Sequence, residues 1–116
     1  MDYESDDYKV REMGTVTVVR LKGPNLTGAL EVNRISDELK AMVDQGVKKL
    51  VVCFKHVQHC GSGGLGMLIA VNKKIKEAGG RLVISHPENI EELLRISKTG
   101  SLFKTAPDPR EAIHLF

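Results

Sequence analysis

Short runs rich in β-branched residues alternate with longer stretches of helical periodicity along most of the chain. The first two runs, 8–13 and 15–21, are separated by Gly14 and predict an antiparallel hairpin. Two later runs, 48–54 and 81–85, each follow a segment with apolar residues at three- and four-residue spacing. A strand, a helix and a second strand in succession imply parallel neighbours. The pattern therefore predicts a small α/β domain with a mixed sheet of four to five strands.

Two predicted helices each carry one apolar face. The segment 29–45 has Thr27 placed to cap its start and Gly46 placed to close its end. The second helix covers about 63–78, and two glycines follow it. We expect both to pack that face against the sheet. The apolar faces comprise Val32, Ile35, Leu39, Met42 and Val43 in the first helix and Leu65, Leu68, Ile69, Asn72 and Ile75 in the second.

The two ends of the chain differ in character. Pro87 is expected to open a third helix, and Asp108 forms a capping box with Glu111 at the start of the last one. The acidic segment 1–7 is expected to be a flexible tail. Residues 8–116 are then expected to form a single domain, which is long enough for a core of its own.

Composition argues against several function classes. The formal net charge of +2 at pH 7 gives no electrostatic reason to expect nucleic acid or a membrane surface as a partner. No apolar stretch approaches the ~20 residues that span a bilayer, and the acidic start is unlike a secretory signal. Only Cys53 and Cys60 occur, which is no disulfide framework. We therefore expect a cytoplasmic protein that needs no cofactor.

The sequence CGSGGLG, residues 60–66, fits the G-x-G-x-x-G spacing of a dinucleotide-binding loop. Two features oppose that interpretation. Six residues, 55–60, separate the predicted strand 48–54 from Gly61, and the next strand ends in Ser85-His86, which supplies no acid to bind the ribose hydroxyl. Residues 67–116 are also too few for the rest of a dinucleotide-binding fold. A small nucleotide- or phosphate-binding domain remains an alternative.

Ser62 lies where the second helix is expected to begin. The free N–H groups and the positive dipole end at a helix start favour an anion, and a phosphoryl group carries about −1.5 to −2 charges. Phosphorylation of Ser62 is thus expected to leave the domain folded while changing the surface that a partner meets. The alternative interpretation is that Ser62 is only an N-cap.

The residues around this loop include metal-ligand types. His56, His59 and Cys60 follow Cys53 closely, but their spacing matches no structural zinc pattern, so no metal site is predicted. Cys60 borders a helix start, which favours a redox-active thiol, whereas a half-buried loop position favours an inert one. Met67 lies off the assigned apolar face, and core packing is favoured for it over an exposed docking role.

The stretch LVVCFKHVQHCGSGGLGMLIAVNKKIKEAGGRLVIS, residues 50–85, resembles the STAS domain of bacterial anti-sigma factor antagonists. The family pattern has a hydrophobic strand, a Val or Ile, Asp-Ser-Ser/Thr-Gly-Leu-Gly opening a helix, and then Gly-Gly-x-Leu. The segments TGSLF (99–103) and DPREAIHLF (108–116) resemble later parts of the family, so the resemblance extends over 8–116. The positions in register are Val57, Ser62, Gly64, Leu65, Gly66, Gly79, Gly80, Arg81 and Leu82.

This resemblance implies a sheet with helices packed mainly on one face and no catalytic activity. It also implies a protein partner, an anti-sigma factor that is a serine kinase and is released when the antagonist becomes phosphorylated, with a phosphatase resetting the switch. The phosphorylated serine corresponds to Ser62. The implied partner-binding residues are Asn25, Leu26, Thr27, Gly61, Ser62, Gly63, Gly64 and Leu65.

Three positions depart from the family pattern. The Asp before the serine is Gly61, the Ser or Thr after it is Gly63, and a second acid found in many members corresponds to Thr27. Two carboxylates expected around the serine are therefore replaced. The sequence leaves open a kinase of altered specificity and an interaction module that binds a partner without being phosphorylated.

Overall fold

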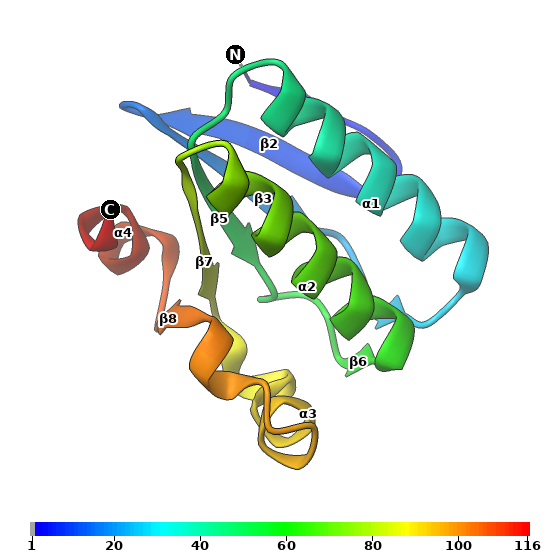
Figure 1. Cartoon of the computed structure of the whole chain (residues 1–116). Helices are drawn as coiled ribbons and strands as arrows, with labels where there is room; N and C mark the ends of the chain where they lie inside the picture. The colour runs from blue at the N-terminus through cyan, green and yellow to red at the C-terminus, as the bar shows by residue number, and fades with distance from the viewer. Residues whose placement is uncertain (1) are drawn as a thin grey trace.

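Six strands form one mixed sheet in the order β1-β2-β3-β5-β7-β8, and helices cover both of its faces (Figure 1). The computed structural model describes residues 2–116. These strands are β1 (Tyr3–Glu4), β2 (Tyr8–Met13), β3 (Val16–Leu21), β5 (Lys49–Cys53), β7 (Arg81–Ser85) and β8 (Lys104–Ala106). A second sheet pairs β4 (Asn25–Leu26) with β6 (His59–Cys60). The helices are α1 (Ala29–Asp44), α2 (Ser62–Glu77), α3 (Glu91–Ile96) and α4 (Pro109–Ala112).

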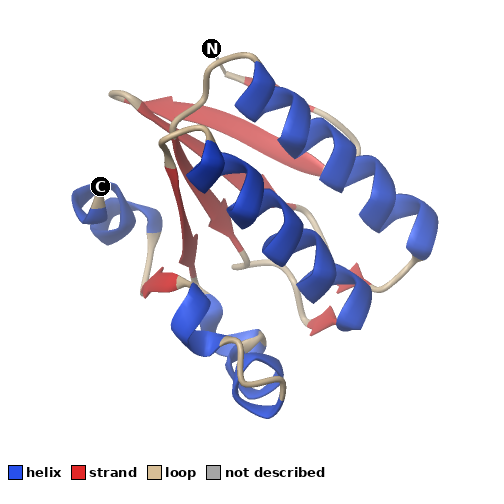
Figure 2. Ribbon diagram, in the orientation of Figure 1, coloured by secondary structure: helices blue, strands red, loops and turns tan. Residues whose placement is uncertain are grey.

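The two long helices, α1 and α2, lie side by side on one face of the sheet, and the short α4 lies on the other (Figure 2). A large apolar cluster between sheet and long helices contains Leu39, Val52 and Ile75, which are fully buried. A smaller cluster on the opposite face joins Val51 to Ala112 of α4. The predicted fold class is confirmed: the sheet is mixed, and the long helices share one face.

The parallel strands bring the starts of α1 and α2 together. β5 pairs in parallel with β3 and β7, so the chain leaves all three strands at the same edge of the sheet. The connections that follow β3 and β5 then pair with each other through β4 and β6, with Leu26 opposite Cys60. Each connection leads directly into a helix. The two long helices therefore begin next to each other at this edge (Figure 1).

Most predicted elements are confirmed. The main sheet has six strands where four to five were predicted, because β1 adds a strand at its edge, and Pro87 opens a 3-10 turn, Pro87–Asn89, that precedes α3.

The other differences lie in α1 and α2. Gly46 has φ +107° and closes α1, as predicted. Thr27 does not cap α1, because the N-cap residue is Gly28 and no side chain caps this helix. In α2, Ile69 is exposed, against the prediction, whereas Met67 is 3% exposed and packs in the core, as the sequence favoured. The buried face of α2 is therefore rotated toward α1 relative to the prediction.

The acidic start of the chain also differs from the expected tail. Tyr3 and Glu4 form β1, which pairs antiparallel with β2. The Asp7 carboxylate accepts two hydrogen bonds from the Arg34 guanidinium of α1, at 2.7 and 2.8 Å. The segment 3–7 is therefore held at two points: residues 3–4 pair with the edge strand β2, and Asp7 forms an ion pair with α1. Their flexibility in solution stays a prediction.

The ion pair between Asp7 and Arg34 predicts a pH-dependent contribution to stability. The hydrogen bond from Arg34 holds the pKa of Asp7 below its usual range in the folded state. This stabilisation is complete above the unfolded-state pKa of about 4 and is lost as the pH falls through the folded-state pKa. Asp7→Asn should therefore lower Tm by about 3 °C at pH 7. The difference from wild type should vanish near pH 2, as measured by circular dichroism. A difference that does not change with pH would contradict the pairing, and the exposed Asp6→Asn is the control.

Candidate functional site

The connection between β5 and α2 is held against the core before it reaches the glycines. Val57 is fully buried, and its carbonyl oxygen accepts a hydrogen bond from the Asn89 side chain at 2.7 Å. The Gln58 backbone N–H donates to the carbonyl of Pro24, and that of Gly61 donates to the carbonyl of Leu26. The glycine loop is thus fixed along the connection that leads into α1.

Ser62 is the first residue of α2 and is exposed. The N-cap residue is Gly61, and no side chain caps this helix, so the interpretation of Ser62 as an N-cap is wrong. The first turn of α2 contains no acidic residue. The Ser62 hydroxyl therefore faces solvent beside uncapped N–H groups at the positive end of the helix dipole, where an added negative charge is stabilised.

The eight predicted partner-binding residues divide into an exposed and a buried group. Leu26 is 2% exposed and Leu65 is 7% exposed, so both side chains pack in the core, and Gly64 is buried against Leu26 and Cys60. These three position the loop without offering side chains to a partner. The residues that reach the surface are Asn25, Thr27, Ser62 and Gly63, with Gly61 half-buried among them.

Gly64 explains part of the glycine pattern without any ligand. A Cβ built on Gly64 would lie 2.6 Å from Cys60 Sγ and 3.1 Å from a methyl carbon of Leu26. The absence of a side chain lets the first turn of α2 pack directly on β4 and β6. Gly64 is a variable position in the G-x-G-x-x-G spacing, so packing within the domain accounts for this glycine and the dinucleotide motif does not.

Leu30 is an exposed apolar residue that the sequence prediction missed. It is the second residue of α1 and is 85% exposed. Its position lies off the apolar face formed by Val32, Ile35 and Leu39, and that displacement was the available signal. Because α1 and α2 begin next to each other, Leu30 and Ser62 belong to the same end of the molecule (Figure 1). We call Asn25, Thr27, Leu30, Ser62 and Gly63 the Ser62 surface.

Cys60 is not activated by its position before α2. Burial raises the pKa of its thiol to about 11, and the Sγ–H donates to the carbonyl of Gly61 at 3.6 Å. Its thiolate fraction at neutral pH is therefore small, which favours the inert interpretation over the redox-active one. His56 and His59 are exposed, and within residues 2–116 no group of three or more metal-ligating side chains is placed to hold an ion.

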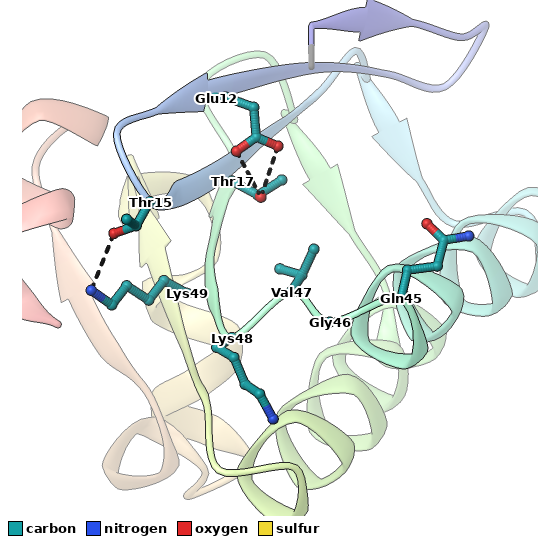
Figure 3. Close-up of a pocket in the computed structure, with 8 residues that line it drawn as sticks. All are labelled: Glu12, Thr15, Thr17, Gln45, Gly46, Val47, Lys48 and Lys49. Atoms are coloured by element: carbon teal, nitrogen blue, oxygen red, sulfur yellow. Dashed lines mark hydrogen bonds between the residues drawn. The ribbon is translucent and has the colours of Figure 1, made fainter.

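A cavity of about 520 Å³ lies at the opposite edge of the sheet from Ser62 (Figure 3). In it, Thr17 donates to the Glu12 carboxylate at 3.1 Å, and Lys49 donates to the Thr15 hydroxyl at 3.2 Å. The adjacent Lys48 donates to the carbonyl of Ala78, just past the end of α2. Lys48 thus neutralises the negative C-terminal end of α2, and Lys49 has a hydroxyl partner, which accounts for both cations without a bound anion.

The STAS domain family model matches residues 7–112. The chain belongs to the STAS domain family. The predicted resemblance is thereby confirmed, and the match takes in both long helices, the glycine loop and most of the sheet. Within residues 2–116, no helix of this STAS domain is long and apolar enough to cross a membrane.

Among known proteins, this STAS domain is similar to bacterial regulators. It is 27% identical over 88 residues to the "Putative anti-sigma factor antagonist BtrV" of Bordetella bronchiseptica, covering 75% of each chain. An anti-sigma-factor antagonist domain protein from Planctomyces limnophilus has a similar structure, with TM-score 0.77, 23% identity and coverage of 94% of this chain and 97% of that one. The Bacillus cell fate determinant SpoIIAA in its phosphorylated form gives TM-score 0.72 at 20% identity, covering 93% and 97%.

Proposed function

We propose that this STAS domain antagonises an anti-sigma factor by binding it through the Ser62 surface. The observation that carries the proposal is the exposed Ser62 hydroxyl at the uncapped start of α2, within the position of the family's glycine loop. The exposed Leu30, in the first turn of the neighbouring helix α1, supplies the apolar contact that interfaces concentrate at their centres. The sequence similarity to the putative anti-sigma factor antagonist BtrV supports an anti-sigma factor as the partner. The protein acts by binding in the cytoplasm and catalyses no reaction.

Phosphorylation of Ser62 is the proposed switch. The anti-sigma factor is a serine kinase: Ser62 Oγ attacks the γ-phosphorus of ATP, ADP leaves, and the hydroxyl proton passes to a base on the kinase. The phosphoryl dianion is stabilised at the start of α2, so the fold is retained. The same dianion must be desolvated when a partner covers it, so the complex dissociates. A phosphatase then hydrolyses the ester and restores binding.

The glycines that flank Ser62 shape this proposal. Gly61 replaces the family's acid, and a Cβ built there would meet only the Thr27 methyl, at 3.8 Å. The kinase therefore meets a neutral, open loop in place of a carboxylate. An interaction module that binds without phosphorylation is the second candidate, and the missing acid at Gly61 is the observation in its favour.

Phosphate incorporation tests the switch. The anti-sigma factor kinases of the source organism are purified, and each is incubated with ATP and this protein. We expect one of them to bind the protein and add a single phosphate, detected by intact mass spectrometry and mapped to Ser62. Ser62→Ala should abolish incorporation, whereas the exposed Ser101→Ala should be modified like wild type.

The alternatives give different results in the same experiment. Stable binding of a kinase without any phosphate transfer would contradict the switch and support the unphosphorylated module. Micromolar binding of ATP or NAD to the isolated protein in calorimetry would support the nucleotide-binding alternative. Failure of every anti-sigma factor of the organism to bind would contradict the proposed function itself.

A further inference from the structure

A narrow groove of about 240 Å³ runs along the surface between α1 and α2, beside the Ser62 surface. Val32 and Met67 contribute apolar atoms to its lining, and the remaining lining residues differ between the two helices. On α1 it is lined by Asn33, Ser36 and Lys40, which we call the donor row because each side chain carries a hydrogen-bond donor. On α2 it is lined by Gly63, Gly66 and Ala70, which we call the bare row. Both rows follow i, i+3, i+7 spacing, so they face each other along nearly two helical turns.

Because the bare row has two glycines and an alanine, another molecule can come close to the α2 backbone there. A Cβ built on Gly66 would meet no atom within 4 Å, and one built on Gly63 would only touch Val32 at 4.0 Å. Neither glycine is therefore required by packing within the domain, in contrast to Gly64. In the interior of a helix glycine is unfavourable relative to alanine. Glycine at position 66 therefore lowers the stability of α2 and leaves a hollow in the protein surface.

The donor row contains a hydroxyl group that has no protein partner among the described residues and lines the groove. Ser36 is 8% exposed, lines the groove, and has no hydrogen-bond partner within residues 2–116. Its oxygen is not among the fully buried unpaired atoms of residues 2–116, so the hydroxyl is open to the groove and can donate to a group placed there. Lys40 next to it forms no ion pair in the described part of the chain, and the nearby Asp44 is already bonded to Lys74 at 3.0 Å. An acceptor with negative charge would satisfy both groups at once.

We propose that the groove receives an acidic segment of the anti-sigma factor, with a carboxylate on the donor row and an adjacent apolar side chain on the bare row. The groove is smaller than the ≈ 300–1,000 Å³ typical of small-molecule sites, which favours a side chain as its occupant. A carboxylate accepts from Ser36 and Lys40 together, and the glycines admit the segment that carries it. This inference rests on the proposed function and adds a specificity contact beyond Ser62.

Affinity measurements with the anti-sigma factor identified by phosphate transfer to Ser62 test this contact. Gly66→Leu fills the hollow and should weaken binding at least about 30-fold. Lys40→Glu should weaken binding about 100-fold, with a partner Asp or Glu substituted by Lys restoring affinity. Gly66→Ala should raise Tm, which shows that the position tolerates a side chain. Lys9→Glu, an exposed charge reversal on β2, is the matched control and should bind like wild type.

The outcomes separate this inference from the proposed function. If Gly66→Leu and Lys40→Glu bind with wild-type affinity while phosphorylated Ser62 does not bind, the groove proposal is overturned and the proposed function stands. If wild-type protein binds no anti-sigma factor, both are overturned. Loss of binding by Lys9→Glu equal to that by Lys40→Glu would indicate general charge attraction and would also overturn the groove contact.

Discussion

Gly80→Ala is expected to destabilise the protein by about 3 kcal/mol and to lower Tm by roughly 10 °C. A Cβ at this position would lie 2.3 Å from the carbonyl oxygen of Lys48 and 2.8 Å from its Cα. That oxygen accepts a hydrogen bond from the Arg81 backbone N–H at 2.8 Å, so it cannot move aside without breaking the start of the β5–β7 pairing. Thermal unfolding followed by circular dichroism measures the effect.

Gly66→Ala provides the matched control for Gly80→Ala. Gly66 is in the interior of α2, and its added methyl group would meet nothing within 4 Å. Alanine should therefore stabilise the protein by up to about 1 kcal/mol through helix propensity. An unfolding midpoint for Gly80→Ala equal to that of wild type would show that β7 does not approach Lys48 this closely.

Leu30→Asp should reduce affinity for the anti-sigma factor by about 100-fold, or ~2.7 kcal/mol, while leaving the fold intact. The side chain is 85% exposed and makes little contribution to the core. A carboxylate in the first turn of α1 is favoured by the helix dipole, so Tm should change little. At an interface centre the same carboxylate loses its hydration and replaces an apolar contact. Isothermal titration calorimetry with the purified anti-sigma factor gives the affinities.

Ile96→Asp is the control for Leu30→Asp. Ile96 is 65% exposed on α3, which lies on the far side of α2 from α1 (Figure 1). The same chemical change at this site should leave affinity within about twofold of wild type, as expected outside an interface centre. Equal losses for the two variants would place the interface elsewhere or attribute the loss to added negative charge alone.

The regular elements were predictable because their signals are local. Within the run 48–54, residues 50–54 are all apolar, as a strand buried on both faces requires, and the hairpin around Gly14 matches its predicted bounds closely. The strands β4 and β6 have two residues each and carry no periodicity, so only their mutual pairing creates them. The exposure of Ile69, which was predicted to face the core, likewise depends on α1, which packs against one side of α2.

The candidate site was predictable in position but not in composition. The glycine loop and the exposed serine followed from sequence, because glycines before a helix mark both a turn and a close approach. The burial of Leu26 and Leu65 did not, since it comes from contacts between two connections far apart in the chain. Leu30 was missed because an apolar residue off the main face indicates a binding surface only when the neighbouring start of α2 is known.

The most direct test compares the affinity of the anti-sigma factor for the unmodified protein and for the same protein phosphorylated at Ser62. Calorimetric titration of both forms at one salt concentration gives the two dissociation constants, and circular dichroism confirms that both are folded. Binding through the Ser62 surface predicts that the phosphorylated form binds at least about 100-fold more weakly. Equal affinities for the two folded forms would contradict the proposed switch.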